Sequence, residues 1–151
     1  MITPAQLRRS CLHLPGAAEE FPFRPDLSVF KVSGKVFALA PLKDAPLRVS
    51  LKCEPALAEQ LRDTYPGIRP GYHLNKRHWN TVDLDGSVPD RLVLEMVEDS
   101  YDLVVAGLPK RVQAELAGRR PSRRPRSGPR RPARAPRAPR AAGSAPARGS
   151  A

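Results

Sequence analysis

The feature that most constrains this chain is an abrupt change of composition near residue 118. Residues 1–118 contain 15 Lys and Arg against 15 Asp and Glu, whereas residues 119–151 contain 11 Arg and no acid. The second part offers only alanine and proline as apolar side chains, so it cannot offset its chain entropy by burying apolar surface. We therefore predict one domain over 1–118 and a disordered basic tail over 119–151.

The periodicity of residues 1–118 follows the order α-β-β-β-α-β-α. A Thr3-Pro4 start and a Pro15-Gly16 end predict the first helix, and a broad apolar stripe predicts a long helix from about residue 89 to 107. Strands are expected at 27–32, 35–42, 47–53 and 78–84, a second helix from about residue 55, and a short last helix near 112–116. This order predicts an α+β fold in which helices pack on one face of an antiparallel sheet.

Two pairs of basic residues fall within the predicted strands. Lys31 and Lys35 flank the turn at Ser33-Gly34, where a wing-like hairpin would present them to a duplex. Arg48 and Lys52 share one face of the third strand, because side chains alternate with a period of two. These residues are candidate nucleic-acid contacts, and an ordinary solvated sheet face is the alternative.

The segment from residue 72 to 81 is rich in cations, aromatic rings and hydrogen-bonding groups. Phosphate contact uses cations and donors, and base stacking uses aromatic faces. Alternatively, Trp79 is a core or lid residue and the Asn side chains satisfy turn backbone. The candidate contacts here are Tyr72, Asn75, Lys76, Arg77, His78, Trp79 and Asn80.

The tail is a candidate tether for a polyanion. If six of its arginines met phosphates, the log–log salt dependence of binding would have a slope of about −5 and little sequence preference. A solubility tail, association with ribosomal RNA and compositional drift are alternatives. The first candidate contacts are Arg119, Arg120, Arg123, Arg124, Arg126, Arg130 and Arg131.

No residue pattern indicates catalysis, a metal or a cofactor. His13, His73 and His78 do not have the spacing of a standard zinc site, and Cys11 and Cys53 are interpreted as buried free thiols. No stretch approaches the roughly 18 apolar residues that span a membrane. We expect a non-enzymatic, cytoplasmic monomer without metal or cofactor, with association with the nucleoid as a further option.

The run from Pro70 to Val82, PGYHLNKRHWNTV, resembles the signature of the MmcQ/YjbR family of small bacterial proteins. Further matches are Glu20-Phe21-Pro22-Phe23, Gly34-Lys35-Val36-Phe37-Ala38, Leu51-Lys52-Cys53 and Ser100-Tyr101-Asp102-Leu103-Val104. The resemblance covers about residues 1–117. It implies a frataxin-like (CyaY-like) fold and DNA binding through a double-wing motif, and it implies no catalytic residues.

Two functional hypotheses follow. The first is DNA binding, with RNA as an alternative, through the tail and the hairpin and loop surface. The second is a small-molecule or protein-interaction module that uses the surface between Tyr72 and Trp79. A continuous positive face containing Lys35, Lys52, Lys76 and Arg77 would favour the first hypothesis, and a concave site beside Trp79 would favour the second.

Overall fold

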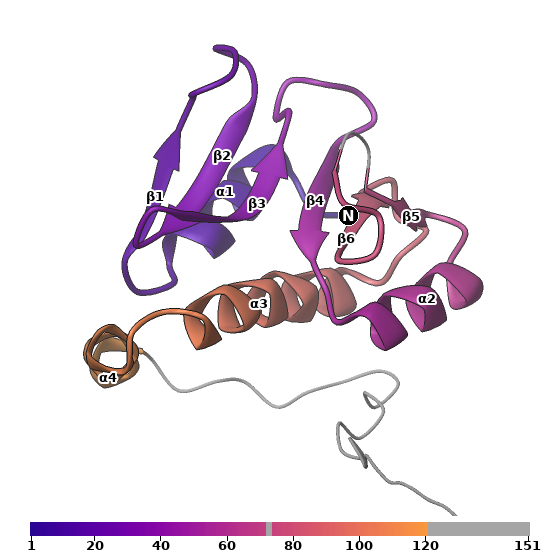
Figure 1. Cartoon of the computed structure of the whole chain (residues 1–151). Helices are drawn as coiled ribbons and strands as arrows, with labels where there is room; N and C mark the ends of the chain where they lie inside the picture. The colour runs from indigo at the N-terminus through magenta and orange to yellow at the C-terminus, as the bar shows by residue number, and fades with distance from the viewer. Residues whose placement is uncertain (72–73, 121–151) are drawn as a thin grey trace, which may run out of the picture.

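The structure is a computed structural model of the chain, and it describes residues 1–71 and 74–120. A sheet of six strands has the order β1-β2-β3-β4-β6-β5, and every neighbouring pair is antiparallel (Figure 1). In chain order the elements are α1 (Pro4–Leu12), β1 (Ala17–Glu20), β2 (Ser28–Val32), β3 (Lys35–Ala40), β4 (Arg48–Lys52), α2 (Pro55–Thr64), β5 (Ile68–Pro70), β6 (Trp79–Asp83), α3 (Asp90–Ala106) and α4 (Lys110–Arg119).

The hydrophobic core lies between one face of the sheet and the helices. The helix α3 contacts β2, β3 and β4, and α1 contacts both β1 and α3. Buried side chains from all four helices form one cluster with alternating strand residues such as Val49 and Leu51. Arg48, Ser50 and Lys52 point to the opposite side, which we call the helix-free face. The predicted α+β architecture with an antiparallel sheet is confirmed.

Two local signals read from the sequence are present as expected. The Thr3 hydroxyl accepts a hydrogen bond from the Gln6 N–H (3.1 Å), and the Gln6 side chain accepts one from the Thr3 N–H (2.9 Å), which completes a capping box. Ser33 and Gly34 have φ angles of 52° and 80° between β2 and β3. Positive φ at both turn residues suits the twist of a two-residue hairpin.

The strands β1 and β5 were not predicted. The residues of β1 are two alanines and two glutamates, which have low strand propensity. It forms nevertheless, because β2 supplies an antiparallel partner and Arg8 and Lys31 form ion pairs with Glu19 and Glu20. The strand β5, expected to be part of a loop, pairs with β6 and ends at Pro70.

A buried serine joins the longest helix to the middle of the sheet. The partner of Phe30 is Ala38 and the partner of Lys31 is Val36, so Phe37 is a bulge residue with no partner in β2. Its ring turns toward the core and meets Tyr101 edge-on, with 5.5 Å between the ring centroids. The Ser100 hydroxyl donates to the Phe37 carbonyl (2.6 Å) and accepts from the Lys52 N–H (2.9 Å).

The buried thiol of Cys11 predicts a pH dependence of stability. Burial, and secondarily the charge of Glu19, raises the pKa of Cys11 to about 12 from 9.0. The unfolded chain ionises this thiol first, so the free energy of unfolding should fall as the pH rises from about 9 toward 12, by up to about 1.4 kcal/mol per pH unit.

Urea unfolding of the parent and of Cys11→Ala at pH 8.0 and 10.5 measures this contribution. The variant should lose less stability between the two pH values than the parent. Equal losses in the two proteins would contradict a buried, protonated Cys11. Because burial also raises the pKa of Tyr101, the comparison between the two proteins, rather than the total loss, isolates the thiol.

Candidate functional site

In the loop before β6, several polar groups form hydrogen bonds within the loop itself. The side-chain oxygen of Asn75 accepts from the Arg77 N–H (2.9 Å), and its carbonyl accepts from the His78 (3.2 Å) and Trp79 (3.0 Å) N–H groups. The Lys76 ammonium donates to the Gly71 carbonyl (3.1 Å). Asn75 and Lys76 therefore stabilise this loop, although both remain exposed.

Asn80 has a structural role, and its position does not support the prediction that it contacts nucleic acid. Its side chain is completely buried. Its oxygen accepts from Nε of Arg62 (2.7 Å) and its amide donates to the Ala58 carbonyl (3.5 Å). Arg62 also donates to the Lys76 carbonyl, so one guanidinium joins α2, the loop and β6. Sequence reasoning missed Arg62, for which the only signal was a basic residue in the last turn of a helix.

Three further residues of this segment were predicted to contact nucleic acid: Arg77, His78 and Trp79. Arg77 is exposed, and His78 and Trp79 are half-buried. Lys52 of β4 lies opposite Trp79 in the strand register, so the two side chains share the helix-free face. Tyr72 and His73 lie outside the described residues. Among residues 1–71 and 74–120, no group of three or more His, Cys, Asp or Glu side chains is placed to hold a metal ion.

The two hairpin lysines do not form one surface. Lys31 pairs with Val36 and Lys35 with Val32, and neighbouring positions in a strand point to opposite faces. The Lys31 ammonium also lies 3.0 Å from a Glu20 carboxylate oxygen. Lys35 is exposed at the turn. A wing that presents both lysines to one duplex face does not match this register.

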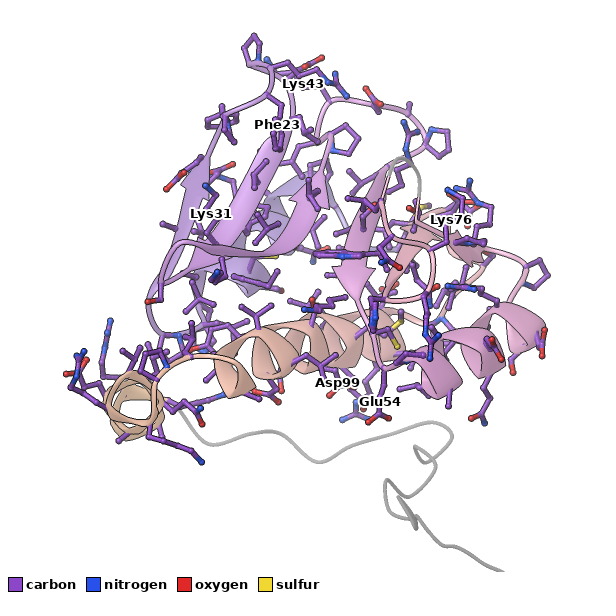
Figure 2. All side chains as sticks on the ribbon, viewed as in Figure 1. Phe23, Lys31, Lys43, Glu54, Lys76 and Asp99 are labelled. Atoms are coloured by element: carbon purple, nitrogen blue, oxygen red, sulfur yellow. The ribbon has the colours of Figure 1, made fainter. Side chains whose placement is uncertain are left out.

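Two other basic side chains of the sheet are offset by a neighbouring carboxylate. Arg48 pairs with Asp44 (3.2 Å) on the helix-free face, and Arg69 of β5 pairs with Asp83. Lys76 lies near β5 and β6, at the opposite end of the sheet from Lys31 (Figure 2). Lys35 pairs with the core residue Val32, whereas Lys52 lies on the helix-free face. The two lysines therefore lie on opposite sides of the sheet, and the one continuous positive face that would have favoured DNA binding by the folded domain alone is not formed by Lys35, Lys52, Lys76 and Arg77.

Near α4, in contrast to the rest of the sheet, exposed basic residues continue along the chain into the tail. α4 exposes Lys110, Arg111 and Arg119, and its single acid is Glu115. The β2–β3 hairpin lies at this same end (Figure 1). A Cβ placed on Gly16 would lie 2.9 Å from the Leu116 side chain and 3.5 Å from that of Val32, so α4 and β2 approach each other here.

Arg120 belongs to the folded domain rather than to the tail, so its prediction as a nucleic-acid contact is not supported by its position. Its guanidinium pairs with Asp102 and, at 3.8 Å, with Glu98. It also lies 5.0 Å from the centroid of the Tyr101 ring. The folded part thus extends two residues past the expected boundary at 118. The predicted contacts from Arg123 to Arg131, and the predicted disorder of the tail, lie outside the described residues.

The helix-free face carries a cavity of about 390 Å³. The connection between β1 and β2 forms one wall, and strands β3, β4 and β6 form the floor. The Ser50 and Thr81 hydroxyls lie 2.9 Å apart on that floor. Phe23, in the connection, is 69% exposed (Figure 2). The lining residues are Phe23, Arg24, Leu27, Leu39, Pro41, Arg48, Ser50, Leu74 and Thr81.

A concave site beside Trp79 was the feature that would favour an interaction module. The observed cavity resembles that expectation, but it is lined by different residues. Among the described residues of the predicted segment between Tyr72 and Trp79, Leu74 lines the cavity and Trp79 does not. The aromatic ring among the described lining residues is that of Phe23, which comes from a different loop. Sequence reasoning missed it, because nothing local indicates that the β1–β2 connection covers the sheet.

Comparison with known proteins identifies the family of this chain. The YjbR family model matches residues 12–103. The chain therefore belongs to the YjbR (MmcQ/YjbR) family, as the resemblance predicted.

Relatives in this family match most of the chain. The uncharacterised protein YbdF of Escherichia coli O157:H7 is 39% identical over 107 residues, which are 70% of this chain and 87% of YbdF. The uncharacterised protein YjbR of Escherichia coli K12 is 38% identical over 109 residues, 72% of this chain and 92% of YjbR.

Solved structures share the fold. The crystal structure of the Deinococcus radiodurans protein DR2400 matches with a TM-score of 0.73 and 45% identity, and covers 78% of this chain and 89% of its own. A crystal structure of a Pseudomonas syringae protein matches with a TM-score of 0.51 and 33% identity, over 58% of this chain and 86% of its own. No helix in the described part of this chain is long and apolar enough to cross a membrane.

Proposed function

We propose that this protein is a non-enzymatic DNA-binding protein that contacts phosphates mainly through its basic C-terminal segment. The observation that carries the proposal is the separation of charge. Residues 1–118 have equal numbers of acidic and basic side chains, whereas the following 33 residues contain 11 arginines and no acid. A cationic segment without acids attracts a polyanion over a distance comparable to the Debye length, about 10 Å at 0.1 M salt.

The folded domain supports this role at the end where the tail begins. Arg119, Lys110 and Arg111 are exposed on α4, and Lys35 is exposed on the neighbouring hairpin. Duplex DNA that follows the tail toward the domain would meet these side chains first. Lys52 and Arg77, at the other side of the sheet, are candidates for a second and weaker contact.

Several finer parts of the sequence-based hypothesis belong to this proposal. They are the double-wing mode of DNA contact, the frataxin-like fold implied by the family resemblance, a cytoplasmic or nucleoid-associated location, and a monomeric state. The register of the hairpin argues for contact through Lys35 rather than through both hairpin lysines.

The salt dependence of DNA binding by the full-length chain tests the proposal. Fluorescence anisotropy with a labelled duplex of about 20 base pairs is measured between about 50 and 300 mM NaCl. If about six arginines neutralise phosphates, the logarithm of the association constant should fall with the logarithm of salt with a slope of about −5. A duplex of the same length with a scrambled sequence should bind equally well, because phosphate contacts carry no sequence information.

Two results would overturn this proposal. One is a slope weaker than about −1, which would mean that few phosphates are neutralised. The other is at least tenfold tighter binding to an RNA duplex of the same length, which would replace DNA by RNA as the partner.

A further inference from the structure

The cavity on the helix-free face is separate from the main proposed DNA contacts, which lie near the tail. Its floor comes from β3, β4 and β6, whereas the exposed basic residues near the tail lie on α4 and the hairpin turn. The volume of about 390 Å³ falls in the range of sites for small molecules, about 300–1,000 Å³. The question is therefore what chemistry a ligand of this cavity would have.

Most of the wall is apolar. Leu27, Leu39, Pro41 and Leu74 supply aliphatic surface from four different segments, and Phe23 supplies a ring at the rim. Apart from Met1, Phe23 and Phe21 are the large hydrophobic side chains that are exposed in the described part of the chain. A ligand with an apolar body would cover the Phe23 ring and remove its surface from water, which is favourable by roughly 25 cal/mol per Å².

The polar part of the wall is cationic or neutral. Arg24 and Arg48 line the cavity, and no carboxylate is among the lining residues that the structure describes. Arg48 donates to Asp44 through one Nη2 hydrogen bond at 3.2 Å. A guanidinium has five N–H donors in a planar fork, so donors remain for a second acceptor.

The floor provides a short polar strip between the aliphatic walls. The Ser50 and Thr81 hydroxyls are bonded to each other at 2.9 Å, with either oxygen able to be the donor. The register of β4 places Arg48 on the same side of the strand as Ser50. The strip crosses from β4 to β6, and Arg48 lies on the same side of the sheet two residues along β4 from Ser50.

From this arrangement we propose that the cavity binds a small apolar carboxylate, with its body against Phe23 and the leucines and its carboxylate at Arg48. Charge-assisted hydrogen bonds between a guanidinium and a carboxylate are about twice as strong as neutral ones, and the planar fork matches the two oxygens. A nucleotide is the competing occupant, but its base edge requires several directional hydrogen bonds that leucine and proline do not supply.

The experiment uses 4-phenylbutyrate and its uncharged amide, 4-phenylbutanamide, as probes in calorimetric titrations of the full-length chain. The acid should bind one-to-one with a Kd of about 1 mM or below, which corresponds to a modest free energy per heavy atom. The amide should bind at least roughly tenfold more weakly, because it lacks the charge that Arg48 recognises. This comparison requires no variant.

Variants locate the binding. Arg48→Gln should weaken binding of the acid roughly tenfold and leave binding of the amide unchanged. Leu39→Trp, which fills the cavity, should abolish binding of both probes, and circular dichroism confirms that each variant is folded. The matched control is Lys31→Gln, which changes a cation on the same face outside the lining and should leave both affinities unchanged.

A further control separates the cavity from the arginine-rich tail, which also attracts anions. In the Gln-tail variant, glutamine replaces Arg123, Arg124, Arg126, Arg130, Arg131, Arg134, Arg137, Arg140 and Arg148. This variant should bind 4-phenylbutyrate as the parent does, so a failure of DNA binding and a failure of the cavity proposal are distinguished.

Three outcomes would overturn the carboxylate site. The acid and the amide could bind equally well, or the acid could lose its binding in the Gln-tail variant. Adenosine monophosphate could also bind at least tenfold more tightly than 4-phenylbutyrate and depend on Arg48, in which case the cavity would be a nucleotide site.

Discussion

The Gln-tail variant is expected to lose more than about 100-fold in affinity for duplex DNA at 0.1 M salt. The reason is that each phosphate neutralised by an arginine releases counterions, and this release supplies most of the free energy of sequence-independent binding. Nine of the 11 arginines beyond residue 118 become uncharged in this variant. The salt slope should fall from about −5 to about −1 or weaker.

The variant leaves Arg119 and Arg120 in place for a structural reason. Arg120 pairs with Asp102 and Glu98 and lies over the Tyr101 ring. Its loss would leave two carboxylates on α3 without their guanidinium, and a fall in affinity could then reflect a destabilised domain. Equal thermal midpoints of the Gln-tail variant and the parent would show that the folded part is intact.

The matched control places lysine at the same nine positions. Lysine keeps the charge but not the planar fork of donors, so an electrostatic tether should keep its affinity within about fivefold and its full salt slope. If the lysine variant bound as weakly as the Gln-tail variant, the guanidinium geometry rather than the charge would be recognised. If the Gln-tail variant bound as tightly as the parent, the folded domain would carry the binding and the proposed role of the tail would be wrong.

The elements that could be predicted from the sequence are those with a strong local signal. The alternation from Val49 to Leu51 in β4, the capping box at Thr3 and the apolar stripe of α3 each depend on residues a few positions apart. The strand β1 has no such signal. Ala17–Glu20 becomes a strand through pairing with β2 and ion pairs with distant residues, and no local propensity contains that information.

The roles of side chains at the candidate site also depend on residues that are distant in the sequence, so they could not be predicted from local patterns. The polar character of Asn80 is visible in the sequence, but its burial depends on Arg62 and Ala58 of α2, 18 and 22 residues earlier. Likewise, Phe23 becomes a cavity residue only because the β1–β2 connection shares one cavity with residues of β3, β4 and β6. A run of polar and aromatic residues therefore indicated a functional surface where the structure uses several of those residues for its own stability.

Substitution of Ser100 by alanine is expected to lower the free energy of unfolding by about 3 kcal/mol. The register of β3 and β4 pairs Ala38 with Leu51, so a continued ladder would place Phe37 opposite Lys52. The bulge interrupts that ladder, and the Ser100 hydroxyl bridges the Phe37 carbonyl and the Lys52 N–H instead. Since Ser100 is completely buried, alanine would leave two backbone groups without partners and with little access to water.

Urea unfolding, followed by the fluorescence of the single tryptophan, Trp79, measures this effect. Ser87→Ala is the matched control, because the Ser87 hydroxyl also makes a short hydrogen bond, to Asp85 at 2.6 Å, but is exposed. The control should lose less than about 1 kcal/mol, because water replaces the missing partner. A loss at Ser100 no greater than that at Ser87 would mean that water or a shift of β3 satisfies the two groups. The two hydrogen bonds of Ser100 would then contribute little to holding α3 against the centre of the sheet.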